Sequence, residues 1–244
     1  MTRREAAIVE VYTGYVTLRG DLRECVYQYA SELLKRRITP FVAWYKRELA
    51  KYPVRVHMET EVKSLDELDT DEIVLATGGT VKNLPIPGGE KTIPVTDMLL
   101  DSTASGETVA IIGGGLAGCE LAYDLAVKGK KPFIIEMQDA LIKDINVNAA
   151  NSQLMRDLLK FHQVPVYLNA KTLRVHDGSI VIENADGQKE LSCDSVVRAT
   201  GFNPNVSLLS GKNKHVHVIG DADKVSNLKG AVWGANNLIL KLSK

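Results

Sequence analysis

The stretch AIIGGGLAG, residues 110–118, lies between an apolar run and a helical pattern. TVAII (108–112) is typical of a buried strand, and LAGCELAYDLAVKG (116–129) of a helix that ends at its final glycine. The glycines satisfy G-x-G-x-x-G, a spacing that provides a tight turn, close approach of the backbone to a pyrophosphate, and close packing of helix on strand. The positive end of the helix then faces the phosphates. The sequence therefore predicts a dinucleotide-binding turn made of Gly113, Gly114, Gly115, Leu116, Ala117 and Gly118.

An acidic residue follows at the position that such a turn requires. Glu136 ends the next apolar strand, PFIIEM (132–137), 23 positions after Gly113, where a spacing of about 20 is expected. A carboxylate there accepts hydrogen bonds from the adenosine ribose and repels a 2′-phosphate. We therefore expect a nicotinamide dinucleotide, NADH in preference to NADPH. The alternative is that the glycines form only a tight turn and that Glu136 is a solvated strand end.

Composition excludes several classes of partner. The 244 residues have a formal net charge of zero and no basic block, which argues against nucleic acid and acidic membrane surfaces. No apolar run approaches the roughly 20 residues that span a bilayer, and the N-terminus lacks the features of a secretion signal. Three scattered cysteines suit a reducing compartment. We expect a cytoplasmic protein.

One pattern occurs twice along the chain. VRVHMETEV…EIVLATGG (54–79) and SIVIENADGQKELSC…SVVRATGF (179–202) each run from alternating strands to a buried strand that ends in Ala-Thr-Gly. DSTASGE (101–107) is a plausible linker between the two units, and Asn151 or Ser152 is expected to cap a helix that carries Leu154, Leu158 and Leu159. The sequence predicts an α/β fold with two domains of one Rossmann-like architecture.

These motifs carry a resemblance to a known family. TVAIIGGGLAGCELAYDLAVKGKKPFIIEM, the two ATG strand ends and HVHVIGDAD (215–223) resemble flavoprotein reductases with two dinucleotide-binding domains. ALIKDINVNAANSQLMRDLL and WYKRELAKYPVRVHMETEV are most similar to the C-terminal part of 2-enoate reductases and 2,4-dienoyl-CoA reductases. The resemblance extends from about residue 36 over nearly the whole chain.

The resemblance implies an FAD domain that is split by an inserted NAD(H) domain. It assigns residues 1–105 and 205–244 to the FAD-type domain and residues 106–204 to the NAD(H)-binding domain. It implies that Ala76, Thr77 and Gly78 lie at the crossover near FAD and that Gly201 ends the NAD(H) domain. It also implies that Gly220 and Asp221 belong to the segment that binds the ribityl chain of the flavin. Alternatively, residues 76–78 are only a strand end and Asp221 is a turn former.

The chain departs from the family pattern at the FAD domain. The sequence has no Gly-rich loop for FAD; REAAIV (4–9) resembles the helix after that loop and GYVTLRG (14–20) the next strand, so the first strand and turn are expected before Met1. Arg19-Gly20 replace the acid that holds the FAD ribose. Each lost charge-assisted hydrogen bond to the pyrophosphate costs about 1.5–3 kcal/mol, so we expect weakened FAD binding.

Other family parts are absent from the sequence. It contains no barrel for FMN and no cysteine cluster for iron–sulfur ligation, so a barrel domain or subunit carrying FMN and an iron–sulfur cluster is an expected partner. No C-x-x-C pair supports thiol chemistry. His215-x-His217 puts two rings on one strand face without an evident third metal ligand.

The predicted function is transfer of hydride from NADH to a flavin, which requires positioning rather than a catalytic side chain. A nucleotide-binding module that does no chemistry is the main alternative. A flavin-free NAD-dependent dehydrogenase is a third possibility, for which we identify no proton-transfer residue.

Overall fold

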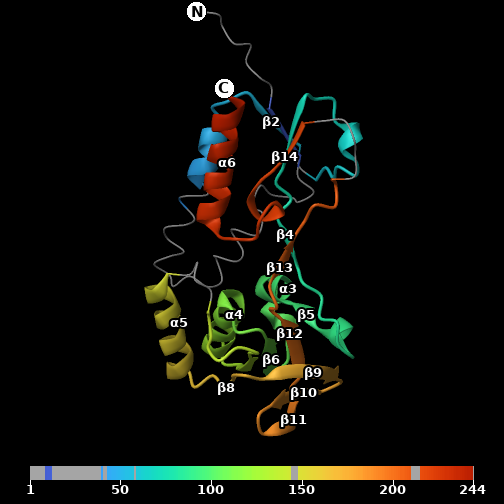
Figure 1. Ribbon diagram of the computed structural model, residues 1–244. Helices are drawn as coiled ribbons and strands as arrows, with labels where there is room; N and C mark the ends of the chain where they lie inside the picture. The colour runs from blue at the N-terminus through green and yellow to red at the C-terminus, as the bar shows by residue number, and fades with distance from the viewer. Residues whose placement is uncertain are drawn as a thin grey trace, which may run out of the picture.

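The chain folds into two tiers joined by a narrow connection (Figure 1). The computed structural model describes residues 9–12, 40, 43–57, 59–143, 148–209 and 215–243. Helix α6 and strands β2 and β14 lie in the upper tier, whereas α3, α4, α5 and the largest sheet lie in the lower one (Figure 1). Among the helices in these ranges, none is long and apolar enough to cross a membrane.

A five-stranded parallel sheet forms the centre of the lower tier. In spatial order its strands are β5 (Ile93–Pro94), β12 (Ser195–Arg198), β6 (Thr108–Ile112), β7 (Lys131–Ile135) and β8 (Val166–Tyr167). The helices are α3 (Val95–Leu100), α4 (Leu116–Val127) and α5 (Ala149–Phe161). An antiparallel meander consists of β9 (Lys171–His176), β10 (Ser179–Asn184) and β11 (Gly187–Ser192). The result is a helix–sheet–meander sandwich.

Alternation of side chains along β6 explains the two faces of this sheet. Val109 and Ile111 are fully buried on the helix side, in a core with Leu121 and Leu125 of α4. Ala110 and Ile112 point to the opposite side and pack in a core with residues of the meander. Both faces of the central strand are therefore covered, as expected for a parallel sheet.

Paired strands organise the rest of the chain. The pairs are β1 (Val9–Tyr12) with β2 (Val54–His57) and β3 (Glu72–Leu75) with β14 (His215–Val218), both parallel, and β4 (Gly79–Val81) with β13 (Phe202–Pro204), antiparallel. Helix α6 (Leu228–Leu242) follows β14 through the short helix η4 (Gly220–Ala222). The other short helices are η1 (Leu65–Glu67), η2 (Gly89–Lys91) and η3 (Ser102–Ala104). In the sequence, β3 precedes the residues of the lower tier and β14 follows them, so this pair joins two segments that are far apart in the chain.

The predicted division at residue 105 stays a prediction. Strand β5 and helix α3 precede that residue, yet β5 pairs with β12 and α3 packs on the core beside α4. Leu84 and Ile86 contact the core on the meander side. This packing places residues 84–104 with the lower tier.

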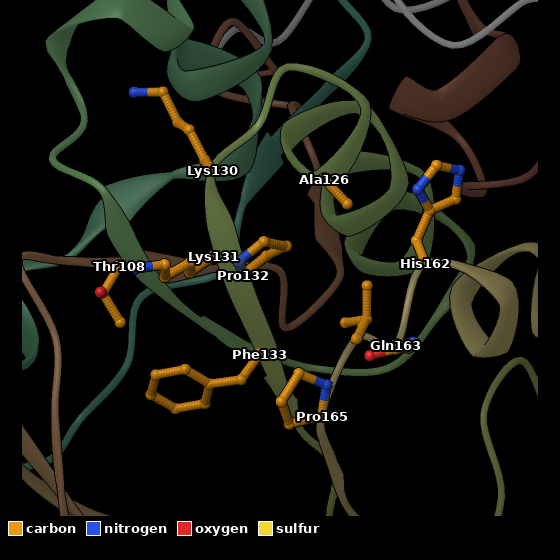
Figure 2. Close-up of a pocket in the computed structure, with 10 residues that line it drawn as sticks. Thr108, Ala126, Lys130, Lys131, Pro132, Phe133, His162, Gln163 and Pro165 are labelled. Carbon is orange, nitrogen blue, oxygen red and sulfur yellow. The ribbon is translucent and has the colours of Figure 1, made fainter.

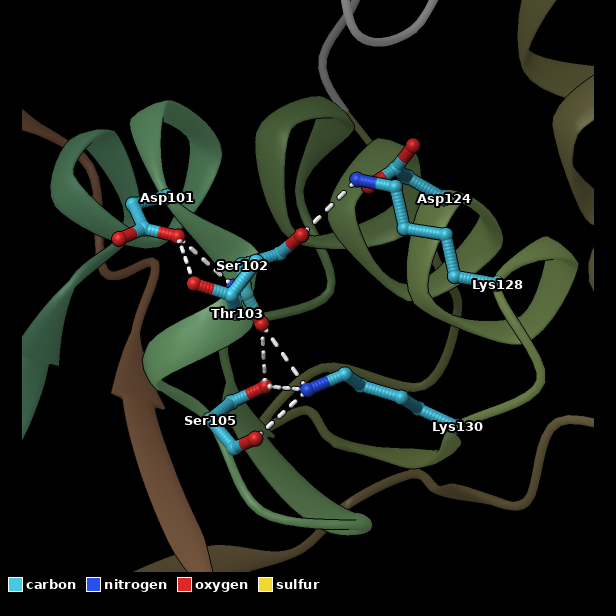
Figure 3. A network of polar contacts seen from close by, with 7 residues as sticks. All are labelled: Asp101, Ser102, Thr103, Ser105, Asp124, Lys128 and Lys130. Atoms are coloured by element: carbon cyan, nitrogen blue, oxygen red, sulfur yellow. Dashed lines mark hydrogen bonds and ion pairs between the residues drawn. The ribbon is translucent and has the colours of Figure 1, made fainter.

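Lys130 fixes the turn between α3 and β6 (Figure 3). Its Nζ donates to the carbonyl oxygens of Ser102 (2.9 Å), Ser105 (2.6 Å) and Gly106 (3.3 Å), and to Oγ of Ser105 (2.5 Å). Lys128, an ion-pair partner of Asp124, donates to Oγ of Ser102. The stretch that the sequence marks as a linker is therefore held firmly on the end of α4.

Two local predictions need comment. The predicted cap of α5 at Asn151 or Ser152 is wrong: the helix begins at Ala149, and the Asn148 side chain accepts from the amide of Ala150 (2.9 Å). Ser152 is buried instead and donates back to the Asn148 carbonyl. The strand expected at 14–20 and most of the helix expected at 4–9 lie outside the described residues, but Val9, the last residue of that expected helix, begins β1.

Candidate dinucleotide-binding site

The turn between β6 and α4 requires glycine at its first and last motif positions. Gly113 has φ +110°, and a Cβ there would lie 2.4 Å from the Ala199 carbonyl oxygen. A Cβ on Gly118 would lie 2.0 Å from the oxygen of Gly113. The first glycine therefore permits the turn, and the last lets α4 pack directly on the strand end.

Gly115 differs from these two glycines because the space around it is open. A Cβ built at Gly115 meets nothing within 4 Å, and the residue is exposed. It is the N-cap of α4, and no side chain caps this helix end. The first backbone N–H groups of α4 therefore face open space, which fits the pyrophosphate of a dinucleotide.

Glu136 lies directly beside this turn, just after the end of β7. Its Oε2 accepts from the amide of Gly114 (2.5 Å), and its Oε1 from the amide of Gln138 (2.8 Å). An ionised carboxylate has about four acceptor positions, so roughly two are left for ribose hydroxyls. The structure thus brings together the turn and the acid that the sequence paired; that they bind nucleotide stays a prediction.

The segment after Glu136 contacts the glycine turn, a contact that the sequence did not predict. The amide of Ile142 donates to the Gly114 carbonyl (2.8 Å), and Arg156 of α5 donates to the carbonyls of Leu141 and Ile142. Ile142 has φ +50°. Nothing in the local sequence signals this conformation, because β-branched residues rarely adopt it.

The residues predicted to lie near FAD gather at the opposite tier. Thr77 and Gly78 both contact Asn205. Oγ1 of Thr77 donates to the Asn205 carbonyl (2.6 Å), and the Asn205 amide donates to the Gly78 carbonyl (2.9 Å). Ala76 directly follows β3, and Gly220 follows β14 after one intervening residue. Since β3 and β14 are parallel, these ends share one edge.

Two further predicted FAD-site residues have structural contacts of their own. Asp221 accepts through Oδ1 from the Ser226 amide (2.9 Å), which holds the turn before α6. This contact fits the turn-former alternative and leaves Oδ2 for a ligand. Gly201 has φ +92°, and its carbonyl accepts from the Lys82 amide (2.9 Å); it therefore lies where β12 leads into the β4–β13 pair.

Residues 37–225 match the family model described as pyridine nucleotide-disulphide oxidoreductase. The chain belongs to this family. Membership implies FAD and NAD(P)H binding as a class and confirms the predicted α/β, Rossmann-like fold.

Relatives within the family support the resemblance seen in the sequence. Cinnamate reductase of Clostridium sporogenes is 32% identical over 200 residues, which cover 80% of this chain and 30% of that enzyme. NADH oxidase of Thermoanaerobacter brockii is 29% identical over 215 residues, covering 81% and 32%. The structure of a 2-naphthoyl-CoA reductase complex matches with a TM-score of 0.82 at 23% identity, covering 93% of this chain and 35% of that one. The chain thus spans about a third of the length of these relatives.

The family name refers to disulphides, yet the two described cysteines are unsuited to thiol chemistry. Both are buried and unpaired. Burial, followed by the charges of Glu120 and Glu136, raises the pKa of Cys119 to about 12, and burial raises the pKa of Cys193 to about 11. Such thiols carry almost no thiolate at neutral pH. Cys119 instead packs in the core between α4 and the sheet.

Glu120 is the other perturbed group on α4. Burial raises its pKa to about 7. Within the described part of the chain, no hydrogen bond or ion pair is formed by its carboxyl group. Burial thus favours the protonated form of this carboxyl group, a property that the sequence does not reveal.

His215 and His217 both contact Glu72 on the neighbouring strand. The distances are 3.0 Å from Nδ1 of His215 and 2.7 Å from Nε2 of His217 to separate carboxylate oxygens. The bond to His217, then that to His215, lowers the pKa of Glu72. Among the described residues no cluster of three or more His, Cys, Asp or Glu side chains is arranged to hold a metal ion.

A cavity of about 420 Å³ lies elsewhere on the lower tier (Figure 2). Its lining includes Thr108 and Lys131, the first residues of β6 and β7. The glycine turn follows the opposite end of β6. Because nucleotides bind at the carboxyl ends of parallel strands, this cavity is not the predicted site.

Proposed function

We propose that this chain is the NADH-binding electron-input module of a flavin-dependent oxidoreductase resembling 2-enoate reductase. The single observation that carries the proposal is the contrast within the glycine turn. Cβ atoms at Gly113 and Gly118 would collide with backbone, whereas one at Gly115 would occupy open space before the uncapped end of α4. That open side fits the pyrophosphate of NADH.

The chain's own residues would bind and orient the nucleotide. Amides at the start of α4 would hold the pyrophosphate, and Glu136, already oriented by Gly114 and Gln138, would accept from the adenosine ribose. The same carboxylate would repel a 2′-phosphate, which favours NADH over NADPH. FAD, when bound, would supply the hydride acceptor, so no protein group need move a proton at this stage.

FAD would lie on the upper tier, along Ala76, Thr77, Gly78, Gly220 and Asp221. The shared edge of β3 and β14 supports this placement. Gly201 would mark the return from the NAD(H) unit to this tier. The outer segments 1–105 and 205–244 would then form the FAD-type domain around the NAD(H) unit of 106–204, with 84–104 packed on the latter.

The recipient of the electrons would be a barrel domain or subunit with FMN and an iron–sulfur cluster. The match covers 30% of cinnamate reductase, and the length of that enzyme outside the match supports a further unit of this kind. We propose a cytoplasmic location for the assembly, because three scattered cysteines suit a reducing compartment.

A nucleotide-binding module without chemistry is the second candidate. It is favoured by the contact of Asp221 with Ser226, which gives this carboxylate a structural role in the turn before α6. In this case the protein would bind NADH but not FAD.

A visible spectrum separates the two candidates. Protein purified and incubated with FAD, then desalted, would show a band near 450 nm if the proposal holds, and anaerobic NADH would bleach it. Colourless protein that binds NADH in calorimetry would favour the second candidate. Protein that binds neither nucleotide would contradict both.

A further inference from the structure

The segment Leu141–Ile142 closes one side of the dinucleotide turn. The Ile142 amide donates to the Gly114 carbonyl (2.8 Å), and Cδ2 of Leu141 lies 2.5 Å from the position that a Cβ on Gly114 would take. Both side chains are buried. Gly114 is therefore held between this segment and Glu136, to which its own amide donates.

Arg156 holds the segment in place from helix α5. Its Nε and Nη2 donate to the Leu141 carbonyl (3.1 and 2.9 Å), and Nη2 also donates to the Ile142 carbonyl (3.3 Å). A guanidinium presents its donors as a rigid fork. The planar fork of a half-buried arginine thus fixes two successive carbonyls.

The backbone of Ile142 needs such support. Its φ of +50° lies in the left-handed region, which is unfavourable for a β-branched residue. A conformation of this kind persists only where surrounding contacts determine it. Burial of Ile142, its bond to Gly114 and the carbonyl contacts of Arg156 are the contacts that do so.

We propose that Arg156 is a positioning residue for the adenosine half of NADH. It acts through Leu141 and Ile142 on Gly114, and through Gly114 on the orientation of Glu136. This inference rests on the proposed function, because it assumes that NADH occupies the glycine turn. Without the Arg156 guanidinium, both the glycine turn and the Glu136 carboxylate would lose their fixed positions. The substitution would therefore raise the Kd for NADH rather than slow hydride transfer.

The test compares three variants. Arg156→Met keeps an apolar stem without donors, and Arg156→Lys keeps the charge without the fork. Lys160→Met removes one charge from an exposed position of the same helix and is the matched control. Calorimetry gives the Kd for NADH and for ADP-ribose, which lacks the nicotinamide. Hydrogen exchange over residues 138–143 reports whether the segment is released.

We expect Arg156→Met to raise both Kd values about tenfold and equally, since a small displacement of a binding group is costly. Exchange in 138–143 should rise with it, Arg156→Lys should be intermediate, and Lys160→Met should match wild type in both readouts. If Arg156→Met does not fold, Arg156→Lys carries the comparison.

Faster exchange with unchanged affinities would show that Arg156 is only structural and would overturn the inference. A loss for NADH without a loss for ADP-ribose would also overturn it, because the adenosine half is common to both. Wild-type protein that binds neither ligand would instead overturn the proposed function, and the inference with it.

Discussion

The backbone nitrogen of Gly114 and Oε2 of Glu136 lie 2.5 Å apart. The two residues end up together because β6 and β7 are parallel neighbours, so the turn after one strand meets the end of the other. One hydrogen bond therefore couples the shape of the glycine turn to the orientation of the carboxylate. Substitutions in either part should affect nucleotide binding.

Replacing Glu136 by Gln should weaken NADH binding and relax the choice of nucleotide. The amide keeps the size of the carboxyl group but loses its charge and one of its two acceptor oxygens. Its NH2 group would therefore face one of the two backbone donors, Gly114 or Gln138, and the ribose would meet a weaker acceptor. We expect the Kd for NADH to rise about tenfold and the preference over NADPH to shrink, because repulsion of the 2′-phosphate is lost. Calorimetry with both nucleotides measures this. Glu90→Gln, which removes an exposed charge outside the glycine turn and its supporting segment, is the control. An unchanged NADH/NADPH ratio in Glu136→Gln would contradict the ribose assignment.

Alanine at Gly115 should weaken NADH binding with little effect on stability, whereas alanine at Gly118 should lower the stability of the fold. Gly115→Ala adds a methyl group to open space, so the free energy of unfolding should stay within about 1 kcal/mol of wild type while the Kd for NADH rises more than about tenfold. Gly118→Ala would place its Cβ 2.0 Å from the Gly113 oxygen and should lower the free energy of unfolding by about 1–3 kcal/mol. Urea unfolding and calorimetry on both variants check the pair. Equal NADH affinities for Gly115→Ala and wild type would contradict the prediction that the pyrophosphate binds at this turn.

Replacing Lys130 by Met should destabilise the lower tier. The variant leaves the carbonyls of the turn before β6 without their charged donor (Figure 3), a loss of about 2–3 kcal/mol. The neighbouring Lys131 pairs with Glu107 at the surface, with a side chain 71% exposed. Lys131→Met should therefore change the free energy of unfolding by no more than about 1 kcal/mol. Equal effects of the two substitutions in urea unfolding would show that the Lys130 contacts do not stabilise the fold.

Glu120→Gln should stabilise the protein at alkaline pH. Burial raises the pKa of Glu120 from 4.5 to about 7, so the folded chain binds this proton more tightly than the unfolded chain does. The favourable contribution is complete below pH 4.5 and is lost as pH rises through 7. The variant should therefore match wild type near pH 4.5 and exceed its free energy of unfolding by about 3 kcal/mol at pH 8. Urea unfolding at both pH values tests this, with exposed Glu90→Gln as control; the same pH dependence in Glu120→Gln and wild type would argue against the raised pKa.

The sequence by itself determined the features that depend on neighbouring residues. Residues 108–129 contain a buried strand, the three glycines of the motif and a helix. The backbone conformation of the turn and the space around its glycines depend on residues only a few positions apart. Glu136 was placed for the same reason, since it directly follows the next strand of the same unit. The ATG strand ends were likewise readable as ends, and the family resemblance grew out of these local signals.

Only the tertiary structure decided which distant residues support the turn. Ile142 takes a left-handed backbone conformation that its type disfavours, and contacts from Arg156 and Gly114 hold it there. The packing of residues 84–104 on the lower tier and the contacts of Glu72 with two histidines arise in the same way, from strands paired across long separations in the chain. Local propensity does not encode such contacts, because their free energy appears only when the distant segments have already come together.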